Sequence, residues 1–193
     1  MTVFPIHLCG NIEYYRALFK AGEFAFEIHE HFPKQTPRNR MEILGPNGRQ
    51  LLIVPTVKRN SRRAIKDVEI SYAENWQKDH WKSLEAAYRR SAYFEFYEDE
   101  LRLFYTKEFR LLVDFNLAYH KLICSLLKLE FKEDFTQDYV DNVDNDFRTH
   151  DFSSTQDDAY FQVFSDRFNF ESGLSILDVL FNLGPQVRSL IVE

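Results

Sequence analysis

The spacing of apolar positions changes twice in the N-terminal part of the chain. Residues 3–6 form a short apolar run, as expected for a buried strand. Residues 12–21 then show helical spacing, with Asn11 as a suitable N-cap and Gly22 as a stop signal. The following EFAFEI, residues 23–28, alternates apolar and polar positions like a strand. This order of elements predicts a βαβ unit.

Residues 41–54 carry the pattern of a β-hairpin. The strand-like runs MEIL and RQLLIV flank GPNG, and Asn-Gly between two such runs is a strong hairpin signal because both residues tolerate the positive φ of a tight turn. Pro55 closes the second strand. A hairpin does not explain the cationic residues just before it, Lys34, Arg38 and Arg40. That cluster is therefore a candidate for a different role.

The rest of the chain is mainly helical in its pattern. KDVEI, residues 66–70, alternates like a short strand after the basic loop 58–64, and LEFK, residues 129–132, is a second candidate strand. Apolar residues recur at four-residue steps from Trp76 to Tyr88, and the stripe includes His80, which we interpret as a core histidine. Further helices are predicted over residues 94–104, 107–127 and 173–184.

The last part of the chain joins an acidic stretch to one more helix. Residues 133–158 are polar and acidic and are interpreted as an extended loop. Ser175 is a candidate N-cap for the final helix. Together the elements predict an α/β (or α+β) fold, with a βαβ-like N-terminal part, a hairpin and a helix-rich C-terminal half. We expect residues 1–193 to form one domain.

Composition and charge exclude some classes of function. The chain is 45% hydrophobic and 28% charged, as is usual for a soluble globular protein. Its net charge is -6, so we expect no nucleic-acid partner, since such binders need a basic field to displace counterions. The basic loop 58–64 is too small to outweigh that charge. The nineteen Phe and ten Tyr predict an aromatic core first and stacking sites second.

The cysteines, the N-terminal residues and the most apolar stretch bear on the location of the protein in the cell. Only Cys9 and Cys124 are present, which indicates neither a disulfide framework nor a thiolate zinc site. The start MTVFPIHLCG has no signal-peptide pattern. The most apolar long stretch carries Arg110, Asp114 and Lys121, so we expect no membrane span. These features predict a cytoplasmic protein.

Several segments in the same order along the chain resemble signatures of the WbqC-like family. They are KQTPRNRMEILGPNG, LLIVP, KDVEI, NWQKDHWKSLEAAYRRSAYFEFY, LLVDFN, NDFR, YFQVFSDRF and GLSILDVLFNLGP. One position departs from the family pattern, which usually has a YxxP or YxPP run after the first strand. This chain has HLCGN there.

The resemblance implies a pathway. The family is bacterial and is associated with lipopolysaccharide O-antigen and other surface polysaccharides. This implies a protein of polysaccharide biosynthesis, acting as a group transferase on a nucleotide-activated or other anionic sugar substrate. A non-catalytic scaffold or assembly protein of the same pathway is the alternative. No cofactor is expected, and the oligomeric state stays open.

The basic residues before the hairpin, which belong to the family motif, are the first candidate binding site. Arg38 and Arg40 would point to the same side of an extended segment, and their paired guanidinium groups suit a phosphate or carboxylate. Asn39 and Lys34 add further donors. We therefore expect these four residues to bind the anionic part of a substrate. The alternative is a set of surface ion pairs.

Two further segments supply candidate catalytic groups. His29 and His31 share a face of an extended segment, and a metal site, an acid–base role and a structural role are all open. No third metal ligand can be named, so no metal site is predicted. In NDFR, Asp146 is a candidate general base or orienting carboxylate, and Asn145 and Arg148 are candidate substrate ligands. A local Asx turn with an internal ion pair is the alternative.

Two weaker candidates remain. Gln162, Asp166 and Arg167 lie among aromatic residues, as in a sugar pocket or a buried polar network. Cys9 would be a nucleophile if it paired with His7 or His29.

Overall fold

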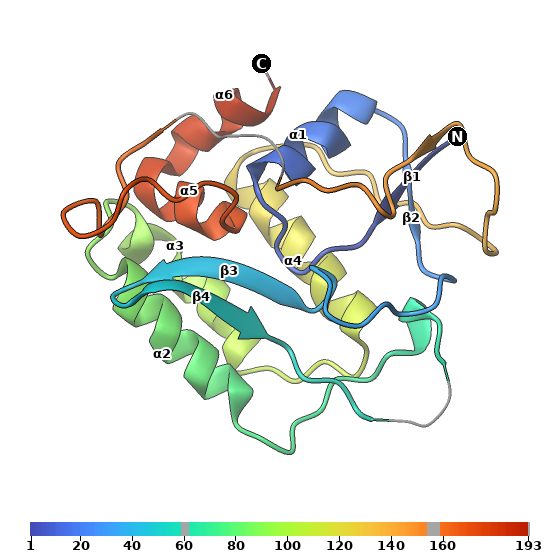
Figure 1. Ribbon diagram of the computed structural model, residues 1–193, viewed down its shortest axis with the longest axis horizontal. Helices are drawn as coiled ribbons and strands as arrows, with labels where there is room; N and C mark the ends of the chain where they lie inside the picture. Colours follow the sequence, from blue (N-terminus) through green and yellow to red (C-terminus); the bar gives the residue numbers. More distant parts are fainter. Residues whose placement is uncertain (59–61, 154–158, 193) are drawn as a thin grey trace.

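In the computed structural model, residues 1–58, 62–153 and 159–192 are described, and they form two small β-structures among helices (Figure 1). This confirms the predicted mixed α/β fold. Part of the predicted basic loop, residues 59–61, and part of the predicted acidic loop, residues 154–158, lie outside the described residues.

The predicted βαβ unit is present. It consists of β1 (Thr2–Pro5), α1 (Ile12–Ala21) and β2 (Ala25–Glu27), and the two strands pair in parallel. Asn11 caps α1 as predicted, because its Oδ1 accepts a hydrogen bond from the backbone N–H of Tyr14 at 3.0 Å. A third parallel strand, β5 (Asn145–Asp146), pairs with the other edge of β1. The acidic segment therefore supplies a strand that its composition does not predict.

The predicted hairpin is also present, but its turn differs from the prediction. Strands β3 (Arg40–Gly45) and β4 (Gly48–Ile53) pair antiparallel, with Gly45 opposite Gly48. The two loop residues are thus Pro46 and Asn47, and only Gly48 has a positive φ, 103°. Because the proline ring fixes φ near −65°, Pro46 cannot be the first residue of a turn that needs positive φ there.

Most helices lie where the pattern predicts them. The helical elements after the hairpin are η1 (Ile65–Asp67), α2 (Trp76–Tyr88), α3 (Phe94–Arg102), η2 (Leu103–Tyr105), α4 (Leu112–Leu126), α5 (Ile176–Leu183), η3 (Gly184–Gln186) and α6 (Val187–Val192). The sequence pattern does not predict η1, η3 or α6. The long helix α4 begins later than predicted, where the N–H of Leu112 bonds to Val68 O at 2.8 Å. None of the described helices is long and apolar enough to cross a membrane.

The two other predicted strands are wrong. The KDVEI segment begins inside the 3₁₀ turn η1, and only Glu69 and Ile70 form isolated bridges. One 3₁₀ turn brings positions i and i+3 to the same side, so it buries Ile65 and Val68 together. LEFK forms no strand, because Lys128 adopts a φ of 53° and the chain turns back on the end of α4.

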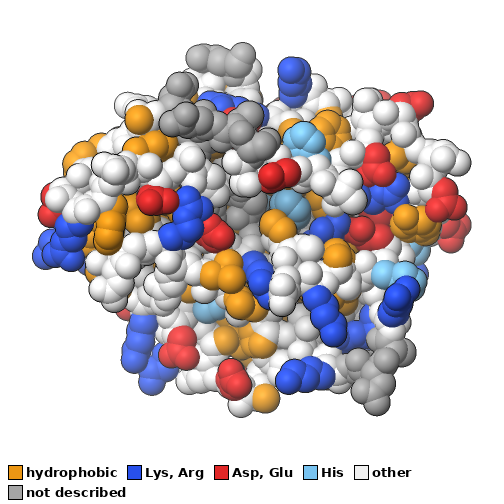
Figure 2. Space-filling model, in the orientation of Figure 1, with side chains coloured by type: hydrophobic (Ala, Val, Ile, Leu, Met, Phe, Trp, Pro, Cys, Tyr) orange, Lys and Arg blue, Asp and Glu red, His pale blue; other side chains and the backbone are white. Residues whose placement is uncertain are grey.

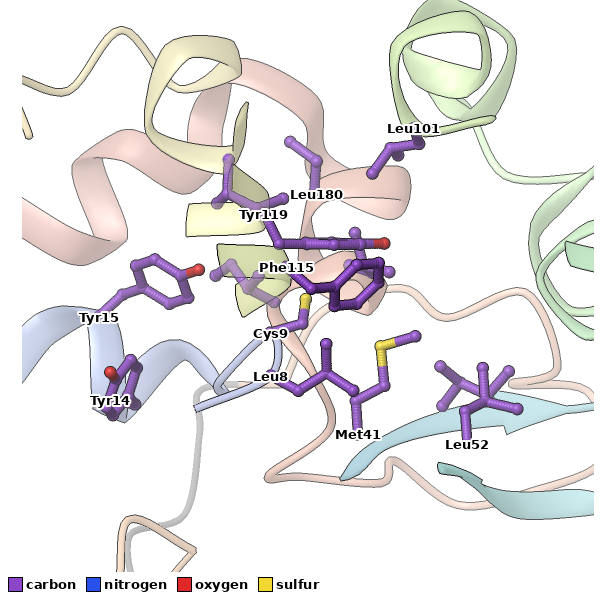
Figure 3. Close-up of a cluster of buried hydrophobic side chains, with 14 of the residues drawn as sticks. Leu8, Cys9, Tyr14, Tyr15, Met41, Leu52, Leu101, Phe115, Tyr119 and Leu180 are labelled. Atoms are coloured by element: carbon purple, nitrogen blue, oxygen red, sulfur yellow. The ribbon is translucent and has the colours of Figure 1, made fainter. Parts of the chain in front are cut away.

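The buried core combines residues from both ends of the chain with the aromatic helices. The stripe from Trp76 to Tyr88 is buried as predicted, and α2 packs against β3. In Figure 3, Met41 and Leu52 of the hairpin point toward the same interior as Phe115 and Tyr119 of α4. This core holds the hairpin and the N-terminal unit against α4, and it thereby fixes the surface between them.

Candidate functional site

A cleft of about 790 Å³ lies between the hairpin and the chain that follows β5. Ligand sites commonly occupy about 300–1,000 Å³, so the volume suits a small organic molecule. In Figure 2 the middle of this face is recessed, and basic, histidine and hydrophobic side chains stand around it. The lining comes from residues 7 and 9–11, residues 35–38, residues 40–42 with 49 and 51 of the hairpin, residues 148–153, and residues 172, 173 and 175.

Arg40 is the cationic side chain of this lining that has no acidic partner among the described residues. It is the first residue of β3 and is half-buried. Its Nε atom is buried and makes no hydrogen bond. By contrast, Arg49 at the other end of the same wall bonds to Glu42 at 2.5 Å and to Glu171 at 2.9 Å. A guanidinium without an acidic partner beside a cleft has the donor geometry that can bind an anion.

Arg38 also lines the cleft, but its charge is already compensated. The side chain is buried, and its Nε and Nη2 donate to the same oxygen of Glu30 at 2.9 and 2.6 Å. Burial raises the pKa of the Glu30 carboxyl, and the charge of Arg38 opposes that rise. The chain turns at Arg38, so the predicted extended segment is wrong, although Arg38 and Arg40 both line the cleft.

Arg148 and Asp146 form the local ion pair that the sequence left open as an alternative. The Nε and Nη2 of Arg148 donate to the two Asp146 oxygens at 2.9 and 2.6 Å, and the Arg148 backbone N–H bonds to Asp146 Oδ1. The hydrogen bonds from Arg148 lower the pKa of the Asp146 carboxyl. Arg38 in turn donates to the Arg148 carbonyl oxygen at 3.1 Å. The two predicted arginines are thus brought together at the cleft wall.

The other predicted site residues do not line the cleft. Asn39 is buried and ties the hairpin ends together through Val54, while Lys34 is exposed in a turn. Asn145 lies in β5 and is exposed. His29 bonds through Nε2 to the carbonyl of Thr136 at 3.1 Å, and His31 is exposed. Within the described ranges, no three His, Cys, Asp or Glu side chains lie where they could hold a metal ion.

The structure reveals positioning residues that the sequence patterns do not distinguish. Asn116 of α4, fully buried, donates to Arg38 O at 2.7 Å and to Ile6 O at 3.3 Å, so it joins the cationic motif to the N-terminal segment. Glu27 of β2, also fully buried, accepts bonds from His29 N and Thr136 Oγ1 and lies 3.6 Å from Arg148 Nη1. The only sequence signal was Asn116's place in LLVDFN.

His7 also lines the cleft, although the sequence singles it out only as a partner for Cys9. It is 6% exposed and stacks on Tyr14, with ring centroids 4.5 Å apart. Burial is the main cause of its lowered pKa, and the nearby charge of Arg38 lowers it further. The imidazole is therefore neutral at pH 7.

The remaining candidates serve the interior. In Figure 3 the Cys9 side chain points toward Phe115 and Tyr119, and burial raises its thiol pKa, which opposes a nucleophilic role. Gln162 donates to Asp178 at 2.9 Å in a buried polar network, which favours that alternative over a sugar pocket. His80 is a buried core histidine as predicted, bonded to Ile53 O at 3.1 Å.

Comparisons with known proteins bear on most of the chain, including much of the cleft. The model of the WbqC-like protein family matches residues 7–154, which contain the cationic motif, β5 and Arg148. The comparisons with curated proteins and with solved structures find no match. The matched range covers well over half of the 193 residues. The chain therefore belongs to the WbqC-like protein family.

Proposed function

We propose that this protein binds a nucleotide-activated or other anionic sugar in the cleft and transfers a group in bacterial surface-polysaccharide biosynthesis. The observation that carries the proposal is Arg40, a half-buried cation at the cleft edge with no acidic partner among the described residues. A phosphate of the substrate would supply the missing partner. The proposal includes a cytoplasmic location and the expected O-antigen pathway.

Arg38 and Arg148 support this role by fixing the wall beside Arg40. Each is locked by at least one carboxylate, so their backbone and side chains are positioned before a ligand arrives. Preorganised side chains reduce the conformational entropy that the protein loses when a ligand binds. The excess positive charge at the cleft therefore falls on Arg40, while its paired neighbours fix the shape of the wall.

A thermal-shift screen tests the proposal and identifies the substrate class. The probes are nucleotide-sugars, free nucleotides and inorganic pyrophosphate, each against wild type, Arg40→Gln and Arg90→Gln. Arg90 is exposed on α2's C-terminal side and makes the same charge change away from the cleft. A ligand that binds only the folded state raises the Tm.

We expect a nucleotide-sugar to raise the Tm of wild type and Arg90→Gln and to leave Arg40→Gln unshifted. A well-folded wild type that responds to none of these anions contradicts the proposal. The scaffold alternative would then be the better explanation for this chain.

A further inference from the structure

His7 stands at the cleft with an unusual combination of rigidity and free ring nitrogens. Its backbone N–H donates to Tyr14 Oη at 3.4 Å, and its carbonyl accepts from His120 Nε2 at 3.0 Å. Its ring lies flat on Tyr14 and meets the edge of Phe152. No hydrogen bond joins either ring nitrogen to another residue in the described part of the chain. The backbone and ring are fixed, while the ring nitrogens are left for another partner.

The surroundings of His7 keep it neutral without a bound ligand. The charged or titratable groups nearest to it come from four segments: Tyr14 on α1, His120 on α4, Arg38 before β3, and His150 with Asp151 after β5. Tyr14 and His120 are uncharged at pH 7, since burial raises the pKa of the first and lowers that of the second to about 4. Arg38 is the fixed positive charge, and Asp151 also lines the cleft.

We propose that His7 is the proton acceptor of the transfer reaction. Its imidazole takes the proton of the acceptor's hydroxyl or amine while that oxygen or nitrogen forms the new bond to the transferred group. The bond from this group to its phosphate breaks, and the phosphate leaves with the bonding electrons. His7 then returns the proton to solvent. The inference rests on the proposed function, because Arg40 must first bind the phosphate of the substrate.

A bound anion would also improve His7 as a base. Negative charge at Arg40 opposes the positive charge of Arg38, which adds to burial in lowering the pKa of His7, so the pKa of the imidazole rises toward the working pH. General bases are most effective when their pKa lies near that pH. The ligand would thus prepare the group that acts on it. This coupling gives the proposal a signature that is independent of turnover.

Histidine-selective NMR of the wild-type protein measures that signature. The Cε1–H resonance of His7 is followed from pH 5 to pH 8.5 with and without saturating inorganic pyrophosphate. His7→Gln identifies the resonance, and through-bond assignment from Ile6 and Leu8 replaces that variant if it does not fold. We expect the titration midpoint of His7 to rise by about one pH unit with pyrophosphate.

Each outcome separates the two proposals. If pyrophosphate binds, and Arg40→Gln abolishes the binding, but the His7 midpoint stays in place, the inference about His7 is overturned and the anion site stands. If neither pyrophosphate nor any nucleotide-sugar of the thermal-shift screen binds, both proposals fall. With the donor found by the thermal-shift screen, His7→Gln is expected to lower kcat by about 100-fold or more. An unchanged kcat in folded His7→Gln overturns the role of His7.

Discussion

Asn116 shows how one buried amide can organise a surface site. Its two hydrogen bonds hold the carbonyl groups of Ile6 and Arg38, which lie far apart in the sequence. Without the amide, both carbonyls would lose a buried partner. The same residue therefore sets the positions of the N-terminal segment that carries His7 and of the turn that carries Arg38.

Replacing Asn116 with Ala should lower the free energy of unfolding by about 2–4 kcal/mol, because two buried carbonyl groups lose their donors. Urea denaturation measures the change. Ser125→Ala, on the exposed face of the same helix, is the matched control and should change stability little. A loss of less than about 0.5 kcal/mol in Asn116→Ala would contradict the bridging role.

The buried histidines predict how stability depends on pH. Burial lowers the pKa of His80 and of His120 to about 4, from an ordinary value of 6.5. The unfolded chain therefore binds more protons between these values, and stability is lost as the pH falls from 6.5 toward about 4. Each such histidine contributes up to about 1.4 kcal/mol per pH unit in that window.

Urea titrations at several pH values test this sign. Between pH 6.5 and 4, His80→Gln should reduce the slope of unfolding free energy against pH by an amount that corresponds to the uptake of about one proton on unfolding. An equal slope in His80→Gln and wild type would show that His80 is already exposed.

The sequence could predict which arginines are candidates, but not how each of them is paired. Arg38, Arg40 and Arg148 all line one cleft. The sequence identifies them as candidates because they are cationic residues within family motifs. The sequence does not show which of these arginines lacks an acidic partner in the described part of the chain. Glu30 and Asp146 compensate Arg38 and Arg148 only because turns bring them within hydrogen-bond distance. His7 could not be selected either, since its cleft is built by segments distant in sequence.

At the element scale, the entry into α1 depends on a glycine. A Cβ atom on Gly10 would lie 2.3 Å from Cδ1 of the Tyr14 ring, which is itself fully buried. The backbone there also accepts the N–H of Ile176 at the start of α5. Gly10 thus allows β1, α1 and α5 to meet behind the cleft. The need for a glycine at this position comes from tertiary packing against Tyr14, which the sequence pattern does not show.

Gly10→Ala is expected to destabilise the protein by about 2 kcal/mol or more, since the rigid ring of Tyr14 cannot move away inside the core. Gly22→Ala is the contrasting variant. It has a positive φ but no atom within 4 Å of the added Cβ, so it should cost about 1 kcal/mol from backbone strain alone. Thermal and urea denaturation compare the two. A smaller loss for Gly10→Ala than for Gly22→Ala would contradict the packing argument.

The strands illustrate which elements local patterns can predict. The pattern of apolar positions and the turn residues predict β1, β2 and the hairpin, because these elements pair with segments close to them in the sequence. β5 has only two residues, Asn145 and Asp146, and it exists because the chain returns to the free edge of β1. The KDVEI pattern failed for the opposite reason. The segment does alternate apolar and polar residues, but it pairs with neighbouring segments only through single isolated β-bridges.

At the scale of the whole molecule, a buried carboxylate ties the acidic segment to the βαβ unit. Glu27 accepts hydrogen bonds from His29 N, Thr136 Oγ1 and Val140 N, and it faces Arg148. One residue of β2 thereby holds the segment that forms the far wall of the cleft. This makes the shape of the candidate site depend on an interaction outside it.

Glu27→Gln should lower the unfolding free energy by about 3 kcal/mol, because the buried guanidinium of Arg148 loses a charged neighbour. Hydrogen exchange of the backbone amides of Val140 and Phe147 should accelerate before that of the helical core. Glu133→Gln, which removes a solvent-exposed pair with Lys121, is the control and should change little. Unchanged exchange in Glu27→Gln would show that other contacts hold the segment.

The most direct test of the central claim is calorimetric titration of wild type, Arg40→Gln and Arg90→Gln with inorganic pyrophosphate at one fixed salt concentration. If Arg40 is the free cation of an anion-binding cleft, its loss removes a charge-assisted hydrogen bond and should weaken binding about 10- to 100-fold. Arg90→Gln should bind with the wild-type Kd. Equal affinity in Arg40→Gln and wild type, with the fold intact, would contradict the assignment of the cleft.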